Sequence, residues 1–215
     1  MAVILNERAV IKRLIAVSGA DKVYYEDLTV AAGTMTELTT TGEAIDTSDN
    51  LNMFEAFQKV FVVNGAKLYV ADFVNTKITD ADGFTNKPSR GDIVHQYHAT
   101  DPAQMVVDYI DSTNTVMYGY VTAGTFRITV AIRTAAGDGA GDVIFPSPDA
   151  GLAKPRWYAW TPYDDDTDTY GSLPAKAYLG CLYRGRCVLS GNPNYPHQWY
   201  MSKIGDPWNW VYSST

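Results

Sequence analysis

The sequence is short of the residues from which catalytic, metal and disulfide sites are made. It holds two cysteines and three histidines in 215 residues, and two cysteines cannot form a disulfide framework. Lys and Arg number 17 against 24 Asp and Glu, giving a net charge of −7. This balance argues against a dedicated nucleic-acid-binding surface, because phosphate contacts need clustered basic side chains. We expect folding in a reducing cytoplasm.

Long apolar runs and long helical patterns are scarce as well. No apolar run approaches the roughly 20 residues that span a bilayer, so no membrane segment is expected. The N-terminal stretch 1–17 carries four charged side chains inside its apolar region, which makes it a poor signal peptide. The best helix candidate is Met1–Ile15, although it has no clear cap.

The residues that are abundant predict a folded β protein. Hydrophobic residues make up 46% of the chain and aromatic residues 13%, with 15 tyrosines, a composition too apolar for a disordered chain. Tyr, Val and Thr favour strands, and short β-branched or aromatic runs alternate with Gly, Asn, Asp and Pro. The expected fold class is all-β.

One hairpin pattern occurs three times along the chain. Each copy has a basic residue near its start, an apolar strand, Ser-Gly or Asn-Gly, and a second strand that contains Tyr. The copies are 13–27, 59–73 and 185–202, with aligned turn glycines Gly19, Gly65 and Gly191 and aligned tyrosines Tyr24, Tyr69 and Tyr200. Glycine reaches a positive φ at little cost, which suits it to the turn between two strands.

The spacing of the copies predicts blades of a β-propeller with an insertion. Gly19 and Gly65 are 46 residues apart, close to the length of a four-stranded blade. Gly65 and Gly191 are 126 residues apart, so about 80 residues are inserted within the second blade, by the same period. We therefore expect propeller blades over 1–87, an inserted small β-barrel or sandwich over 88–146, and a blade continuation over 147–215.

The inserted stretch reads as a set of short strands with turns between them. The segments that predict strands are "DIVHQY", "QMVVDYI", "TVMYGYV", "TFRITVAI" and "DVIF". Three recognisable blades are too few for a closed propeller of about four to eight blades. We expect the blade series to be truncated at Thr215, as the N-terminal part of a longer protein; the alternative is that the later blades come from another chain.

Two segments resemble β-propeller tail proteins of tailed bacteriophages, the nozzle, hub or packaged-DNA-stabilisation proteins of short tails. They are "NMFEAFQKVFVVNGAKLYVADFVNTKI" (52–78) and "YRGRCVLSGNPNYPHQWYMSKIGDPWNW" (183–210). The shared pattern is a basic residue, a hydrophobic strand, a small residue with Gly, an aromatic-x-Ser strand and an acidic-Pro-aromatic-Asn-aromatic ending. The inserted stretch looks more weakly like a small β module of phage structural proteins.

The resemblance implies a structural virion protein without catalysis, cofactor or metal. Such a protein would form a ring of identical subunits, expected to be a hexamer, beside portal, adaptor, tail or fibre proteins. DNA would pass through it without specific binding, since an acidic channel repels phosphates. The expected location is the virion tail, assembled in the host cytoplasm.

Other short motifs are better explained without chemistry. His95 and His98 would lie on opposite faces of a strand, and the acidic loop at 164–168 lacks the glycine and the glutamate of a calcium loop. Cys181 and Cys187 are expected to be buried free thiols.

The tryptophans and one long turn are the remaining candidate sites. Aromatic residues between blades usually pack in the core, so we interpret five tryptophans as blade-packing residues: Trp157, Trp160, Trp199, Trp208 and Trp210. The third hairpin has an expanded turn that the other copies lack, and it is the candidate interaction turn: Asn192, Pro193, Asn194, Tyr195, Pro196, His197 and Gln198. The alternative functions are a carbohydrate-binding or glycosidase-like propeller, in which the tryptophans stack on sugars, and a host-derived repeat scaffold.

Overall fold

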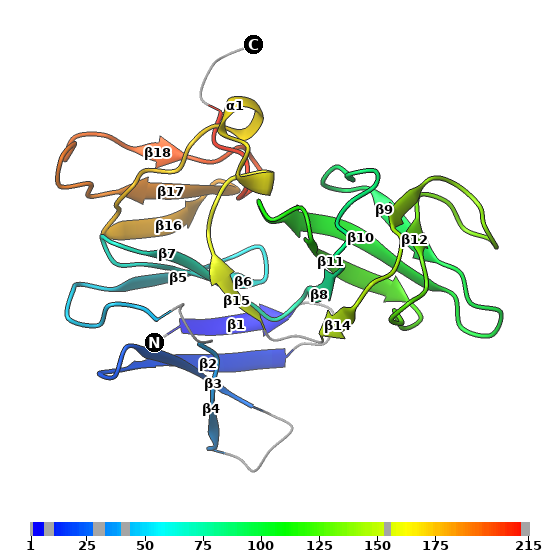
Figure 1. Cartoon of the computed structure of the whole chain (residues 1–215). Helices are drawn as coiled ribbons and strands as arrows, with labels where there is room; N and C mark the ends of the chain where they lie inside the picture. The colour runs from blue at the N-terminus through cyan, green and yellow to red at the C-terminus, as the bar shows by residue number, and fades with distance from the viewer. Residues whose placement is uncertain (1, 7–10, 28–32, 40–43, 153–155, 212–215) are drawn as a thin grey trace. The chain divides into compact units, whose positions relative to one another are not determined.

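The computed structural model describes residues 2–6, 11–27, 33–39, 44–152 and 156–211 (Figure 1). Its regular structure is nearly all β, which confirms the predicted all-β fold of blade-like sheets with an inserted β module. The helices of this part are a single-turn α1 (Thr167–Tyr170) and a 3-10 turn η1 (Tyr163–Asp165). None of the described helices is long and apolar enough to cross a membrane.

The chain divides into two compact units. The first unit comprises Met1–Phe73, Pro155–Pro162 and Thr167–Thr215, and the second comprises Val74–Lys154 and Tyr163–Asp166.

The first unit contains three antiparallel sheets, each of which follows the order of the chain. The first sheet is made of β1 (Ala2–Asn6), β2 (Ile11–Ser18), β3 (Lys22–Glu26) and β4 (Met35–Glu37). The second sheet is made of β5 (Asn52–Ala56), β6 (Lys59–Val63), β7 (Leu68–Asp72) and β15 (Arg156–Ala159). The third sheet is made of β16 (Leu179–Tyr183), β17 (Arg186–Ser190) and β18 (Tyr200–Met201). In all three sheets the repeated hairpin forms the second and third strands.

The second unit enters the chain between the third and fourth strands of the second sheet. Strands β7 and β15 are hydrogen-bonded neighbours, with Asp72 opposite Arg156. The two ends of the insertion are therefore held together by one sheet, as in an ordinary hairpin.

The N-terminal segment differs from its prediction. Strands β1 and β2 pair in antiparallel register, with Ala2 opposite Ile15, so the helix expected over Met1–Ile15 is wrong. The segment is rich in Val and Ile, whose branched side chains lose freedom in a helix and fit a pleated sheet. Apolar residues at several phases therefore indicated strands rather than a helix.

The turn glycines behave in two ways. Gly65 and Gly191 have φ of 77° and 79°, as expected for the turn of each hairpin. In the first hairpin the positive φ falls on Asp21 (59°) instead of Gly19. Aspartate is among the residues that tolerate this region, and the Asp21 carboxylate accepts a long-range hydrogen bond from the Thr47 amide at 2.7 Å.

The second sheet lies between the first and third sheets, as the blue, cyan and orange strands of Figure 1 show. All five residues of β6 are buried. Because side chains alternate along a strand, Val60 and Val62 face the first sheet and Phe61 faces the opposite way. A strand that is buried on both faces reads as a continuous apolar run, and "VFVV" is such a run.

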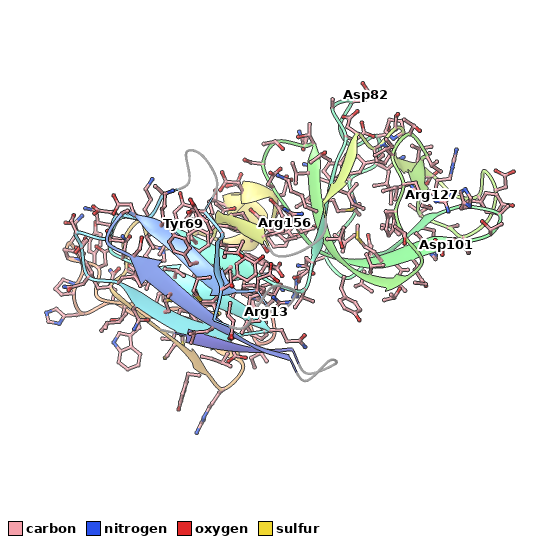
Figure 2. All side chains as sticks on the ribbon, turned by 90° about the horizontal axis from the view of Figure 1, so that it is seen from below. Arg13, Tyr69, Asp82, Asp101, Arg127 and Arg156 are labelled. Atoms are coloured by element: carbon pink, nitrogen blue, oxygen red, sulfur yellow. The ribbon has the colours of Figure 1, made fainter. Side chains whose placement is uncertain are left out.

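The core between the first and second sheets is aliphatic and aromatic. Ile15 and Val23 pack against Val60 and Val62. Tyr69 stacks on Trp157 with ring centroids 4.9 Å apart. At its edge, the Arg13 guanidinium lies 5.8 Å from the Tyr25 ring and 5.4 Å from the Phe73 ring, and Figure 2 labels Arg13 and Tyr69 on this unit.

The core between the second and third sheets is an aromatic cluster. Trp160 lies 4.3 Å from Phe61 and 5.4 Å from Trp210, between ring centroids. The indole N–H groups of Trp160 and Trp210 both donate to the Pro207 carbonyl, each at 2.9 Å. A buried indole N–H needs an acceptor, and one carbonyl with two lone pairs serves both rings.

Glycine at position 180 allows β16 to approach β5. A Cβ atom added to Gly180 would lie 2.3 Å from the Phe54 ring and 3.2 Å from Leu189. The absence of a side chain at Gly180 therefore sets how closely the third sheet packs on the second.

The second unit is a curled seven-stranded sheet (Figure 1). Its strands in spatial order are β13 (Val143–Phe145), β12 (Ile132–Arg133), β9 (Ile93–Gln96), β10 (Ala103–Ile110), β11 (Val116–Ala123), β8 (Thr76–Thr79) and β14 (Ala150–Leu152). It is longer at both ends than the expected 88–146, because β8 pairs with β11 and β14 pairs with β8. Tyr163 also belongs to this unit, where its hydroxyl donates to the Pro88 carbonyl at 2.9 Å.

One predicted strand of the second unit is largely absent. Of "TFRITVAI" (125–132) only Ile132 lies in a strand, and Thr129 has a positive φ of 61°. The buried Gln96 amide holds this stretch: it donates to the carbonyls of Arg127 and Val130 and accepts from the Arg127 amide, over 2.6–2.8 Å. Hydrogen bonds to the Gln96 side chain thus replace those that a neighbouring strand would make. Figure 2 labels Arg127 in this stretch.

We predict that the first unit folds without the second. Replacing residues 74–154 by Asn-Gly joins β7 to β15 through a four-residue turn, a common hairpin length. Tyr163, buried in the second unit, is changed to Ser in the same chain. Circular dichroism should show a β protein that unfolds cooperatively. Phe61→Ala should destabilise both this chain and the full chain by about 3–5 kcal/mol. Loss of cooperative unfolding would show that the sheets need the inserted unit.

Candidate interaction surface

The third sheet has one covered face and one uncovered face. Gly180 and Leu189 are cross-strand partners whose side faces Phe54 of the second sheet. Side chains one residue away point to the other side. We call this other side the open face; its members are Leu179, Cys181, Tyr183, Val188 and Met201, and Trp199 of the preceding turn lies beside it.

The open face is unusually apolar for an exposed surface. Leu179 is 58% exposed and Trp199 is 73% exposed, and Tyr183 and Met201 are exposed as well. Single exposed apolar residues need no explanation, but a contiguous group marks an interaction site.

A hollow of about 330 Å³ opens on this face. Its lining includes Leu179, Cys181, Val188 and Trp199, with Asn52 and Ser190 as polar members. Among the described residues, Asn52 Oδ1 is the one buried side-chain oxygen or nitrogen that has no hydrogen-bond partner. A buried acceptor without a donor is costly, so the hollow suits a molecule that brings an N–H or O–H group to Asn52.

The candidate interaction turn, residues 192–198, is held by its own hydrogen bonds. The Tyr195 amide donates to the Asn192 carbonyl and the Gln198 amide to the Tyr195 carbonyl, both at 3.0 Å. The Tyr200 hydroxyl donates to Gln198 Oε1 at 2.7 Å. Asn192 is buried, whereas residues 193–198 are exposed. The turn therefore presents Tyr195 and Trp199 on an ordered loop.

The tryptophans divide into two groups. Four of the predicted packing tryptophans are buried: Trp157, Trp160, Trp208 and Trp210. Trp199 is the exception, and its interpretation as a packing residue is corrected. The expanded turn ends directly before β18, so Trp199 has left the hairpin register and lies outside the covered face of the sheet.

The two cysteines also differ from each other, so the expectation of two buried thiols is corrected. Cys187 is buried and Cys181 is exposed. Cys181 lies opposite Val188 and Cys187 opposite Leu182, so the two thiols point to opposite faces of the sheet and do not pair. Burial raises the pKa of the Cys187 thiol well above its ordinary value.

The other motifs do not form a site. No group of three or more His, Cys, Asp or Glu side chains that could hold a metal occurs in the described part of the chain. His98 contacts Arg127 and Thr100, and Asp164 pairs with Lys87. The lining of the hollow includes no carboxylate, imidazole or amine, so the surface offers apolar contact and hydrogen bonding.

Sequence reasoning missed the open face and Asn52. The apolar residues of β16 predict a strand, but the side that remains uncovered depends on which sheet packs on Gly180. The turn length was the one available signal, since only the third copy carries extra residues before its second strand. Comparison with protein-family models, curated proteins and solved structures returned no match.

We predict that the two thiols react at very different rates. At pH 8 a disulfide reagent such as DTNB should modify Cys181 promptly, since it is exposed. Cys187 should stay unmodified in the native protein because burial keeps it a neutral thiol. In denaturant both cysteines should react, and each chain should then release two equivalents of the reagent's coloured thiolate. Rapid native labelling of a Cys181→Ser variant would contradict the placement of Cys187.

Proposed function

We propose that this chain is a structural subunit of a bacteriophage tail, of the nozzle or hub type, and that it carries no catalysis. The observation that carries the proposal is the stack of three sheets built on one repeated hairpin, in which the two segments that resemble propeller tail proteins form the second and third sheets. The open apolar face fits a subunit that is buried in an assembly.

In this proposal the subunits form a ring of six beside portal, adaptor or fibre proteins. The net charge of −7 supports a conduit through which DNA passes without sticking, because like charges repel phosphates. The chain would reside in the virion after assembly in the host cytoplasm. The second unit, most of which is inserted between β7 and β15 of the second sheet, is available for contacts with a neighbouring protein.

Mass spectrometry of purified phage particles tests this proposal. Particles from the source of the sequence should contain peptides of this chain in a constant ratio to a portal subunit. The peptides should co-sediment with intact particles and with detached tails, and stay absent from emptied heads without tails. Particles that infect normally and lack the chain would refute the tail assignment.

A carbohydrate-binding module is the second candidate, and one observation favours it. Trp199 and Tyr195 are exposed on an ordered turn, and the hollow beside Trp199 contains the unsatisfied Asn52 acceptor. Sugars stack on exposed aromatic rings and donate hydroxyl groups, which matches both features. The buried tryptophans, in contrast, are not available for such stacking.

Glycan-array binding of the full chain tests the second candidate. If the chain binds a glycan, Trp199→Ala should abolish binding, whereas Trp199→Phe should retain part of it by keeping an aromatic ring. Both variants should unfold like the parent protein, because surface substitutions change stability by only about 0.5 kcal/mol. Binding that survives Trp199→Ala would place the sugar elsewhere, and no binding would remove this candidate.

A further inference from the structure

The first sheet also has an uncovered face. Ile15 is buried against the second sheet, so Ala16, the next residue, points away from it. Tyr24 lies opposite Ala16 and therefore shares that side. We call this side the outer face; a hollow of about 290 Å³ on it is lined by Ala16, Val17, Ser18, Tyr24 and Met35.

The register of the hairpins shows which residues of the three sheets are equivalent. Each repeated tyrosine has a cross-strand partner two or three residues before the turn glycine: Ala16 for Tyr24, Val62 for Tyr69 and Leu189 for Tyr200. The third hairpin is thus offset by one residue from the glycine alignment, because its turn is longer. Tyr69 and Val62 face the first sheet, and Leu189 faces the second.

The sheets therefore stack in the same direction each time. In each later sheet, the face that carries the repeated tyrosine packs on the preceding sheet. It contacts the face of that preceding sheet that does not carry the tyrosine. In the second sheet that opposite face carries Phe54 paired with Phe61. The equivalent pair in the third sheet is Cys181 with Val188, on the open face.

The two uncovered faces therefore correspond to the two surfaces that meet wherever one sheet of the stack packs on the next. The open face of the third sheet corresponds to the side of the second sheet that receives the third. The outer face of the first sheet, with Tyr24, corresponds to the tyrosine side that each later sheet presents. Terminal repeats that end a stack carry polar outer faces, whereas Leu179, Tyr183 and Met201 are exposed apolar residues.

Each face carries charged side chains, of opposite sign at Arg186 and Glu26. Arg186 lies opposite Tyr183 and so shares the open face. On the outer face, Glu37 is the cross-strand partner of Tyr24 and Glu26 occupies the same side two residues along. Lys22 lies 2.8 Å from Glu37 and pairs with that carboxylate.

We propose that the open face of the third sheet binds the outer face of the first sheet of a second copy of this chain. The inference deepens the ring proposal and rests on its self-association. It assigns the surfaces that touch, and it makes the contact head-to-tail. Such a contact closes into a ring if the rotation fits and otherwise extends. The second copy would also supply the donor that Asn52 lacks, for which the Tyr24 hydroxyl is chemically suited.

Two variants that block one face each test the proposal. Leu179→Glu places a charge on the open face, and Ala16→Glu places one on the outer face. Ile128→Glu is the matched control, since Ile128 is an exposed apolar residue of the second unit. Light scattering after gel filtration should show assemblies of the parent and the control, and a mass near 23.7 kDa for each blocked variant alone.

Mixing the blocked variants distinguishes head-to-tail docking from other contacts. The Leu179→Glu chain keeps a working outer face and the Ala16→Glu chain keeps a working open face. An equimolar mixture should therefore form a one-to-one complex that cannot extend. In the same mixture, alkylation of Cys181 should slow in the Ala16→Glu chain and stay fast in the Leu179→Glu chain. Met201→Glu serves as a second open-face variant, and protection of Cys187 reports that each variant is folded.

Several outcomes would overturn the inference. Assembly of the Ala16→Glu chain alone, with loss in the Leu179→Glu chain, would show that two open faces bind each other. Parent oligomers that neither variant disrupts would refute these surfaces while leaving the proposed ring in place. A parent chain that stays monomeric at high concentration would refute self-docking, and the open face would then receive a further sheet of the same repeat or another protein. Peptides of the chain in virions test the tail assignment independently of all three.

Discussion

Burial of the second sheet on both faces is the constraint on which the first unit depends. Strand β6 places valines on one side and Phe61 on the other, so two separate cores share one strand. The second sheet also buries an ion pair. Lys59 lies 3.9 Å from Asp72, both side chains are buried, and the Tyr158 hydroxyl donates to the Asp72 carboxylate at 2.8 Å. A buried ion pair holds only if its geometry satisfies both partners, which requires β6, β7 and β15 to keep their register. The sheet is thus the reference against which both neighbours are placed.

The same constraint explains why function is expected at the ends of the stack. A sheet in the middle uses both faces for packing and has none left for a partner. The first and third sheets each use one face, and the face that remains carries apolar and charged side chains, with a hollow on each. The longest turn of the three repeated hairpins and the exposed thiol both occur on the third sheet, away from the aromatic cluster around Pro207. Stability and interaction are therefore carried by different residues of the same hairpin.

Much of the fold could be predicted from sequence because the hairpins are local. A basic residue, an apolar run, a small turn and a tyrosine specify two paired strands without reference to distant residues, and the 46-residue step between Gly19 and Gly65 predicts that the pattern repeats. Long-range contacts were harder to predict. The Gln96 side chain replaces a strand at Arg127 and Val130, and no local pattern signals that.

The candidate site could be predicted less well than the fold. The expanded turn was visible in the sequence, but the exposure of Trp199 depends on how the turn meets β18. The side of β16 that stays uncovered depends on Gly180 and Phe54, residues far apart in the chain. Asn52 reads as a strand residue before an apolar run, and its unsatisfied oxygen arises only once the third sheet is packed beside it.

The attachment of the second unit has a mechanical consequence. Its main stretch leaves after β7 and returns at β15, where Asp72 and Arg156 are cross-strand neighbours, about 5 Å apart as adjacent strands are. A pull on the folded second unit acts on β7 and β15 in the same direction, so the hydrogen bonds between β6 and β7 resist it together. Tension would reach the buried Asp72 first. The load from this connection thus enters the stack through its middle sheet, which both neighbouring sheets cover.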